Sequence, residues 1–294
     1  MEAMSLLTMS DMRGLEIIKE AVDDGNPYAM NLYGKILREG DLVDKNLAEA
    51  HRYFLLSAEQ GIDEAQYYVG MSHYLGLGAK QDYRYAINWF RVAAEKGNPK
   101  AQYAMGLCYL NGYGVYKDPG FAKLWFTMSA DNGYSAALIA LGDMYMDLNN
   151  PERDYKEAAR LYKTAADAED PDAYYKIGIC CLQGKGVSQN IHKAFTYFEQ
   201  GTEAGNRDCI YQLGLMYEKG SGTEEDPAVA AELIQRAADL GCLEAKNHID
   251  NKISMKKHGD IIIEGDLDTP DIIAGFKGPE ETGGILGLFN RKKE

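Results

Sequence analysis

The sequence predicts an all-α solenoid of six stacked helical hairpins, each 36 residues long. Three columns of small residues recur at that period without an insertion. The first column is Gly34, Gly70, Gly106, Gly142, Gly178 and Gly214. Five residues earlier stand Ala29, Ala65, Ala101, Ala137, Ala173 and Cys209, and sixteen residues later stand Ala50, Ala86, Ala122, Ala158, Ala194 and Ala230. Repeats of this length are typical of supersecondary units that bury a core only by stacking on their neighbours.

Each repeat is predicted to hold two amphipathic helices that cross where the side chains are small. In the third unit, Gly106 and Ala122 provide this close approach, and Trp125 and Phe126 follow as a bulky pair. We expect such pairs to fill the space between successive hairpins. The matching pairs are Tyr53–Phe54, Trp89–Phe90, Leu161–Tyr162, Tyr197–Phe198 and Leu233–Ile234.

The connection inside each hairpin has its own signals. Gly112 and Gly114 permit positive φ at the end of the first helix, and Asp118 can cap the start of the second. Equivalent glycine pairs are Gly76/Gly78, Gly184/Gly186 and Gly220/Gly222, and equivalent capping residues are Asp82, Asp154, Asn190 and Asp226. The fourth unit departs from this pattern, because Leu148 and Asn150 replace its loop glycines and Glu169 replaces its closing glycine. Drift in a tolerant loop and a change of curvature that shapes a binding cleft both explain the departure.

The repeat string A-Q-Y-x-x-G-x-x-Y-x-x-G-x-G-V-x-x-D-x-x-x-A-x-x-W-F resembles the Sel1-like repeat, a relative of the tetratricopeptide repeat. The resemblance covers roughly residues 11–256, with a half-unit at each end. It predicts an all-α, right-handed superhelical α-solenoid of six hairpins with half-repeat caps. Residues 1–10 form a variable N-terminus, and residues 257–294 form an extended C-terminal tail. The family is a binding scaffold used in unrelated settings, so the resemblance implies fold more strongly than function.

Composition limits the partners. With 31 basic and 45 acidic residues the chain carries a net charge of −14, which argues against nucleic acid as the main partner. The first residues lack a basic leader region, and no stretch has the length of a membrane span, so we expect a cytoplasmic protein, although many relatives are exported.

The sequence offers no catalytic, metal-binding or cofactor-binding constellation. The histidines form no H-E-x-x-H motif, and His73 falls in a column of packed residues. The glycine loops lack the spacing of a P-loop or a nucleophile elbow. Five cysteines, odd in number and without metal-type spacing, are expected to be buried free thiols. They are Cys108, Cys180, Cys181, Cys209 and Cys242. A cysteine-rich branch of the family has paired cysteines bridged within each hairpin, a pattern that this chain lacks.

By analogy with tetratricopeptide stacks, first helices line a concave groove through the positions three before, one after and four after the conserved glycine. The candidate partner-binding residues are Tyr67, Met71, Tyr74, Tyr103, Leu107, Leu110, Ile139, Tyr175, Ile179, Tyr211 and Leu215, and the same rule includes Met146. Tyrosine combines a broad apolar face with a hydroxyl, which suits an interface. The same side chains could instead pack between neighbouring repeats.

The tail ends in a compact apolar cluster followed by a basic end. Residues 285–294 hold Ile285, Leu286, Leu288 and Phe289, and then a run of three cations at 291–293. This segment is a candidate docking motif for a protein partner or for the protein itself. Shallow contact with an anionic membrane and incidental hydrophobic residues in a disordered terminus are the alternatives.

These features together predict a non-catalytic adaptor or scaffold that recognises a protein or peptide partner in its groove. An immunity or inhibitor protein that neutralises a partner enzyme is a second binding hypothesis. A hydrolase, as reported for some cysteine-rich relatives, is the hypothesis from a different class. The sequence names neither the partner nor the oligomeric state.

Overall fold

A computed structural model describes residues 12–258, and within that range it contains fourteen α-helices and no strand. The predicted all-α solenoid of six hairpins with half-repeat caps is confirmed. The helices are α2 (Met12–Asp23), α3 (Pro27–Glu39), α4 (Leu47–Glu59), α5 (Asp63–Leu75), α6 (Tyr83–Glu95), α7 (Pro99–Asn111), α8 (Pro119–Asp131), α9 (Ser135–Met146), α10 (Tyr155–Asp167), α11 (Pro171–Gln183), α12 (Ile191–Glu203), α13 (Arg207–Lys219), α14 (Pro227–Asp239) and α15 (Leu243–His258).

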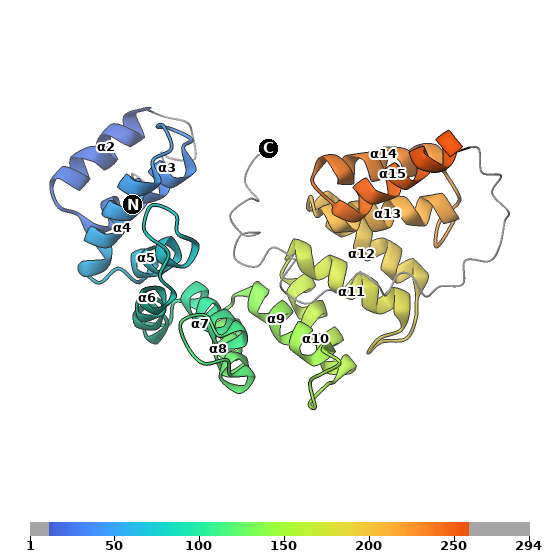
Figure 1. The fold of residues 1–294 in the computed structure, drawn as a ribbon, viewed down its shortest axis with the longest axis horizontal. Helices are drawn as coiled ribbons and strands as arrows, with labels where there is room; N and C mark the ends of the chain where they lie inside the picture. The colour runs from blue at the N-terminus through green and yellow to red at the C-terminus, as the bar shows by residue number, and fades with distance from the viewer. Residues whose placement is uncertain (1–11, 259–294) are drawn as a thin grey trace.

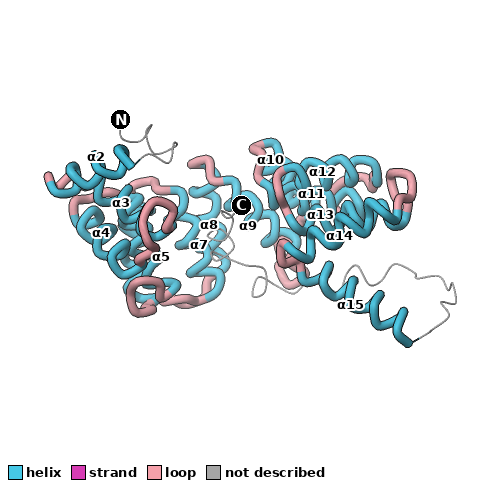
Figure 2. Tube along the Cα trace, turned by 90° about the horizontal axis from the view of Figure 1, so that it is seen from above, coloured by secondary structure: helices cyan, strands magenta, loops and turns pink. Residues whose placement is uncertain are grey.

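The hairpins follow one another around an open arch whose two ends carry the half-repeats α2 and α15 (Figure 1). Figure 1 shows α5, α7 and α9 on the inner side of this arch and α6, α8 and α10 outside them. Farther along, α11 contacts both α9 and α13, so these three first helices lie side by side in one layer. Because neighbours in a curved stack approach most closely on its inner side, this layer forms the concave face. Figure 2 shows the same row of hairpins from above, with helices joined by short loops.

The hairpin loops fold as their glycines and capping residues predict. In the third repeat Asp118 Oδ1 accepts a hydrogen bond of 3.0 Å from the Phe121 backbone N–H. Gly112 ends α7 with φ of 80°, and its N–H donates to the Cys108 carbonyl at 2.8 Å. The predicted caps Asp82, Asp154, Asn190 and Asp226 likewise accept hydrogen bonds from the first turns of their helices.

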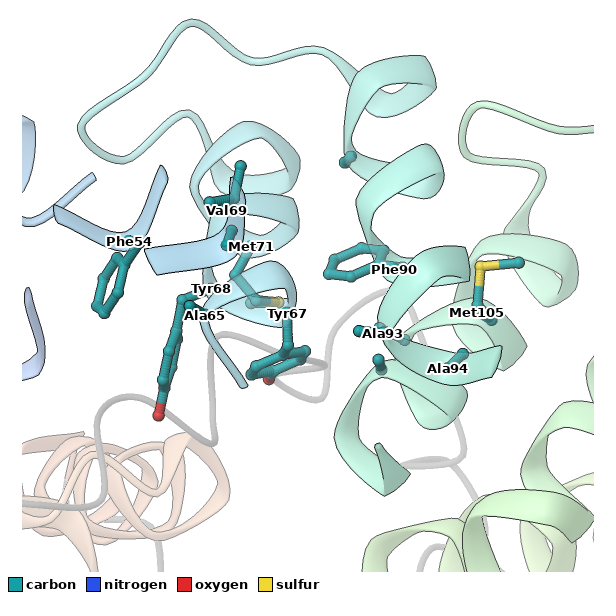
Figure 3. Packing of buried hydrophobic residues seen from close by; sticks show 14 of the residues in the cluster. Phe54, Ala65, Tyr67, Tyr68, Val69, Met71, Phe90, Ala93, Ala94 and Met105 are labelled. Atoms are coloured by element: carbon teal, nitrogen blue, oxygen red, sulfur yellow. The ribbon is translucent and has the colours of Figure 1, made fainter. Parts of the chain in front are cut away.

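Each hairpin core contains one large side chain packed on the conserved glycine. A Cβ added to Gly106 would stand 2.5 Å from Phe126, and Figure 3 shows the equivalent Phe90 projecting from α6 toward α5. The side chains in this column are at most 3% exposed. They are Phe54, Phe90, Phe126, Tyr162, Phe198 and Ile234.

The expected role of the bulky pairs was therefore wrong in one respect. The second member of each pair packs on the glycine of its own hairpin, although Phe54 also stacks at 4.7 Å on Tyr68 of the next one, and most first members, such as Trp125, are only partly buried. The reason is geometric: successive residues on a helix are separated by about 100°, so both members of a pair cannot face the same crossing point.

Polar side chains join successive hairpins at the starts of the first helices. Asn98 caps α7 through its Oδ1 and donates its Nδ2 hydrogen to Asp63 of the preceding repeat at 2.8 Å. Asn206 and Asp172 form the same link three repeats later, also at 2.8 Å. One amide thus satisfies a helix end and fixes the register between repeats.

The fourth hairpin is irregular where its glycines are missing. The helix α9 ends one residue early, and its last residues are covered by Asn150, whose Nδ2 donates to the Met144 carbonyl at 2.7 Å. Glu169 adopts φ of 58°, the one positive φ of a non-glycine residue in the described part of the chain. The buried cores of the two halves of the arch also meet here, since Leu141 of α9 belongs to one cluster and Ile139 to the next. Both interpretations of this irregular unit stay open.

Candidate functional site: the concave groove

The predicted groove residues divide into two groups by burial. Four of them are at most 9% exposed, and these are Tyr67, Met71, Leu107 and Ile139. The other seven are half-buried: Tyr74, Tyr103, Leu110, Tyr175, Ile179, Tyr211 and Leu215. Side chains of the second group retain accessible surface, which a partner-binding residue needs.

In the N-terminal half of the arch the aromatic candidates contact one another and the core. The Tyr67 ring lies 5.3 Å from the Tyr68 ring and 6.0 Å from that of Phe90, and burial raises the Tyr67 pKa. Tyr74 lies 5.7 Å from Tyr113, and burial raises the Tyr74 pKa as well. This half therefore favours the packing alternative for its tyrosines.

Tyr103 lies in the middle of the arch, where it packs against other rings but stays half-buried. Its ring packs at 5.3 Å against Tyr134 and at 5.4 Å against Phe126. Burial raises the Tyr103 pKa, and the tyrosine hydroxyl of Tyr134 and the carboxylate of Asp143 raise it further. Tyr103 is thus packed against aromatic rings, as the tyrosines of the N-terminal half are, and it is also affected by the charge of Asp143.

A small pocket opens where α9, α10 and α11 meet. It is lined by Met146, Tyr162, Tyr175, Lys176, Ile179, Cys180, Gln183 and Lys185. Three of these residues, Met146, Tyr175 and Ile179, occupy predicted groove positions. The Gln183 Oε1 atom is buried without a hydrogen-bond partner. The pocket is thus small, with a largely apolar lining, two lysines and one unsatisfied acceptor.

Asp143 of α9 binds two of the residues that line this pocket. The carboxylate accepts a hydrogen bond from Lys176 Nζ at 2.7 Å and another from the Tyr162 hydroxyl at 2.6 Å. These two hydrogen bonds connect α11 and α10 to α9, so the three helices that line the pocket are held in place relative to one another.

The sequence analysis missed Lys176 and Gln183, although a helical pattern could have found them. Asp172, Lys176, Ile179 and Gln183 follow one another by four, three and four residues, which is one stripe along a helix. The rule borrowed from tetratricopeptide stacks marks Tyr175, Ile179 and Leu182 on this helix and so shares only Ile179 with the stripe.

Three carboxylates in register form one edge of the groove. Asp172, Asp208 and Glu244 stand 36 residues apart at the starts of α11, α13 and α15, and we call them the acidic edge. Burial raises the Asp208 pKa, and Glu244 and Asp172 add to the rise although Arg207 opposes it. Burial also raises the Tyr175 pKa, followed by the charges of Asp208 and Glu244. Tyr175 therefore lines the pocket and is also near enough to the acidic edge for its carboxylates to affect the tyrosine pKa.

One group of potential metal donors occurs among the described residues. Ligand atoms of Asp208, Cys242 and Glu244 lie within 4.8 Å of one another. Burial raises the Cys242 pKa to about 12, so its sulfur is a thiol at neutral pH. Three donors leave a tetrahedral zinc shell incomplete, and we assign no metal to this group.

The buried thiols among the described residues are poorly suited to nucleophilic catalysis. All five cysteines are buried and free, as predicted, and burial raises the pKa of Cys108 and of Cys180 to about 12. A thiol with such a pKa supplies almost no thiolate at neutral pH. His73 is half-buried beside the rings of His51 and Tyr85 at 5.1 and 4.4 Å, in line with its predicted packing role.

The predicted tail motif, with Ile285, Leu286, Leu288 and Phe289, lies outside the described residues. Within residues 12–258, none of the helices combines the length and the apolar character that crossing a bilayer requires.

An arch of stacked 36-residue hairpins with a groove along its first helices defines an α-solenoid repeat protein. The Sel1 repeat family model matches residues 27–62, 63–98, 99–134, 135–170, 171–206 and 207–242, and the chain belongs to the Sel1 repeat family. A search of curated proteins finds no match.

Solved structures share the fold. A Sel1 repeat protein from Oxalobacter formigenes is 29% identical, with a TM-score of 0.75 over 81% of this chain and 98% of the other. A protective antigen of uropathogenic Escherichia coli with an SLR fold is 28% identical, with a TM-score of 0.64 over 79% of this chain, which spans 50% of that protein. An immunity protein from Pseudomonas aeruginosa is 18% identical, with a TM-score of 0.53 over 74% of this chain and 83% of its own. At that identity the likeness shows the fold alone.

Proposed function

We propose that this protein is a non-catalytic adaptor or scaffold that binds a protein or peptide segment in its concave groove. Sel1 repeat proteins typically mediate protein–protein interactions, which supports the class of function. The observation that carries the proposal is the pocket between α9 and α11, because Met146, Tyr175 and Ile179 line it from predicted groove positions.

The contact surface proposed is the C-terminal half of the groove. There Tyr175, Ile179, Tyr211 and Leu215 are half-buried, so their backbones are fixed while part of each side chain stays accessible. Binding a segment there would cost little ordering of the receptor, and tyrosine and aliphatic side chains supply apolar area. The acidic edge alongside favours segments that carry basic residues.

The proposal can be tested with peptides selected against the full-length chain from a random library and measured by calorimetry. We expect Tyr175→Ala and Ile179→Ala each to weaken binding of the selected peptides by about tenfold or more, as truncation of interface anchors does. The matched control is Leu124→Ala on the outer helix α8, where the side chain is 61% exposed. Peptides that bind all three variants equally would contradict the groove assignment, provided that thermal melts show the variants folded.

A further inference from the structure

We propose that residues 285–293 of the chain bind in the C-terminal half of its own groove, with one side chain of the apolar cluster at the α9–α11 pocket, the others on the groove surface beside it, and the basic end on the acidic edge. The inference uses the groove assigned in the proposed function and adds a ligand that the chain itself carries. Three features of the molecule support it: charge, apolar match and chain length.

The charges of the two surfaces are complementary. The acidic edge holds Asp172, Asp208 and Glu244, and Arg207 pairs with one of them, its Nε lying 3.7 Å from Asp208 Oδ1. The carboxylates repel one another, since Glu244 and Asp172 both raise the Asp208 pKa. Three consecutive cations at 291–293 would relieve this repulsion.

The apolar cluster of the segment matches the adjoining surface. Four large apolar side chains within 285–289 precede the cations, with one residue, Asn290, between them. In the groove Tyr175 and Ile179 follow Asp172 of the acidic edge along the same helix, α11, and Met146 lines the pocket beside them. The unpaired Gln183 Oε1 in the pocket could accept a hydrogen bond from a backbone N–H of an incoming segment.

The chain is long enough and leaves the arch at the right place. The last helix, α15, ends at His258, and its Lys252 and His248 pair with Glu218 of α13, the helix that also carries Tyr211 and Leu215. Residues 259–284 can span at most about 90 Å when extended. They hold seven acidic residues and one lysine, so attraction to the acidic edge is confined to the end of the chain.

The consequence is competition within one molecule. A tethered segment has a high effective concentration at its site, and an outside partner must displace it. The apparent affinity for that partner falls in proportion to the fraction of chains whose groove is open.

The direct test places a photo-crosslinker in the full-length protein by the substitution Phe289→p-benzoylphenylalanine. After irradiation, mass spectrometry should find its main attachment sites on α9, α11 or α13, around Met146, Ile179 and Leu215. An equal mixture of light and isotope-labelled chains identifies which molecule is attached, and we expect pairs within one chain. Attachment to the outer helices, scattered attachment, or pairs that mix the isotopes would overturn the proposal, the last in favour of a second copy as the occupant.

The electrostatic part has a separate readout. The triple variant Asp172→Asn, Asp208→Asn and Glu244→Gln should lower the yield of groove attachment at least fivefold. The matched control removes three exposed carboxylates from second helices, Glu95→Gln, Glu199→Gln and Glu232→Gln, and should keep the yield. Should the triple variant fold poorly, a salt titration of the crosslinking-labelled wild-type sequence gives the same information, because screening must reduce the yield. A yield that does not respond to salt overturns the charge argument.

The two proposals fail in different ways. If outside peptides bind the groove with the same affinity whether or not Phe289→Asp is present, and no attachment to the groove is found, the tail inference fails while the adaptor function stands. If the tail attaches to the groove but no outside peptide binds even to the Phe289→Asp variant, the adaptor function fails while the inference stands.

Discussion

The ring of Phe126 lies directly against Gly106, where an added Cβ would stand 2.5 Å from two ring carbons. This contact recurs in all six hairpins with the same glycine column, and the large partner is fully or almost fully buried each time. The two helices of a hairpin can therefore approach this closely only because glycine lacks a Cβ atom. The distance between successive hairpins depends on that close approach.

Gly106→Ala should destabilise the protein, because the ring of Phe126 cannot move without disturbing a close-packed core. Overpacking of this kind costs about 1–3 kcal/mol, which exceeds the helix-propensity gain of alanine. The matched control is Gly120→Ala in the first turn of α8, where the nearest atom, Asp118 Oδ1, would lie 3.2 Å from the new Cβ and belongs to a side chain. Urea unfolding curves of both variants should separate, and coincident midpoints would contradict the packing role of Gly106.

The closing glycines of the repeats give a second prediction, because Glu169 occupies the position that Gly133 and Gly205 hold in neighbouring repeats. Its φ of 58° is compatible with glycine and unfavourable for glutamate. Glu169→Gly should therefore stabilise the fourth hairpin by up to about 1 kcal/mol. The reverse change, Gly133→Glu, places a side chain at φ of 83° in open space and should destabilise by a similar amount. Thermal melts measure both, and shifts in the same direction would contradict the backbone explanation.

Alkaline pH should destabilise the protein through its buried thiols. Burial raises the pKa of Cys108, Cys180 and Cys242 to about 12, from an ordinary value of 9.0. The folded state therefore holds these protons more tightly than the unfolded state does. Stability is unaffected below the ordinary pKa and falls as pH rises from about 9 toward 12.

This prediction is checked by urea midpoints measured at neutral pH and at two alkaline values. A thiol reagent provides the control: at slightly alkaline pH it should react slowly with the native protein and quickly in denaturant. A urea midpoint that increases as the pH is raised above 9 would contradict the prediction. Rapid labelling of all five cysteines in the native protein would contradict it as well, because it would show that the thiols are more accessible than their burial indicates.

The fold was predictable from sequence because its determinants are local and repeated. Residues such as Gly106 and the capping residue Asp118 act within one hairpin. Because the glycine recurs in register in all six hairpins, the pattern can be recognised in the sequence. What the sequence left undecided was which tyrosines keep accessible surface. Tyr67 and Tyr175 occupy equivalent positions 108 residues apart, yet one is buried and the other half-buried. The difference arises from neighbours such as Tyr68, whose place in the fifth repeat is taken by Lys176.

This contrast between equivalent tyrosines gives the last prediction. Tyr67 is 5% exposed and packs against Tyr68 and Phe90, so Tyr67→Ala should lower stability by about 3–5 kcal/mol, as loss of a buried aromatic ring does. Tyr175→Ala removes a half-buried ring that contacts Phe198 at 6.5 Å and should cost less stability.

Tyr175→Phe separates the two contributions further, because it keeps the ring and removes only the hydroxyl, whose pKa Asp208 and Glu244 raise. We expect Tyr175→Phe to melt close to the unchanged protein, while Tyr175→Ala weakens the binding of groove-selected peptides. Thermal melts and calorimetric titrations of the three variants measure stability and binding side by side. If Tyr175→Ala loses as much stability as Tyr67→Ala and peptide affinity is unchanged, Tyr175 is a packing residue like its counterpart, and the proposed contact surface loses its central side chain.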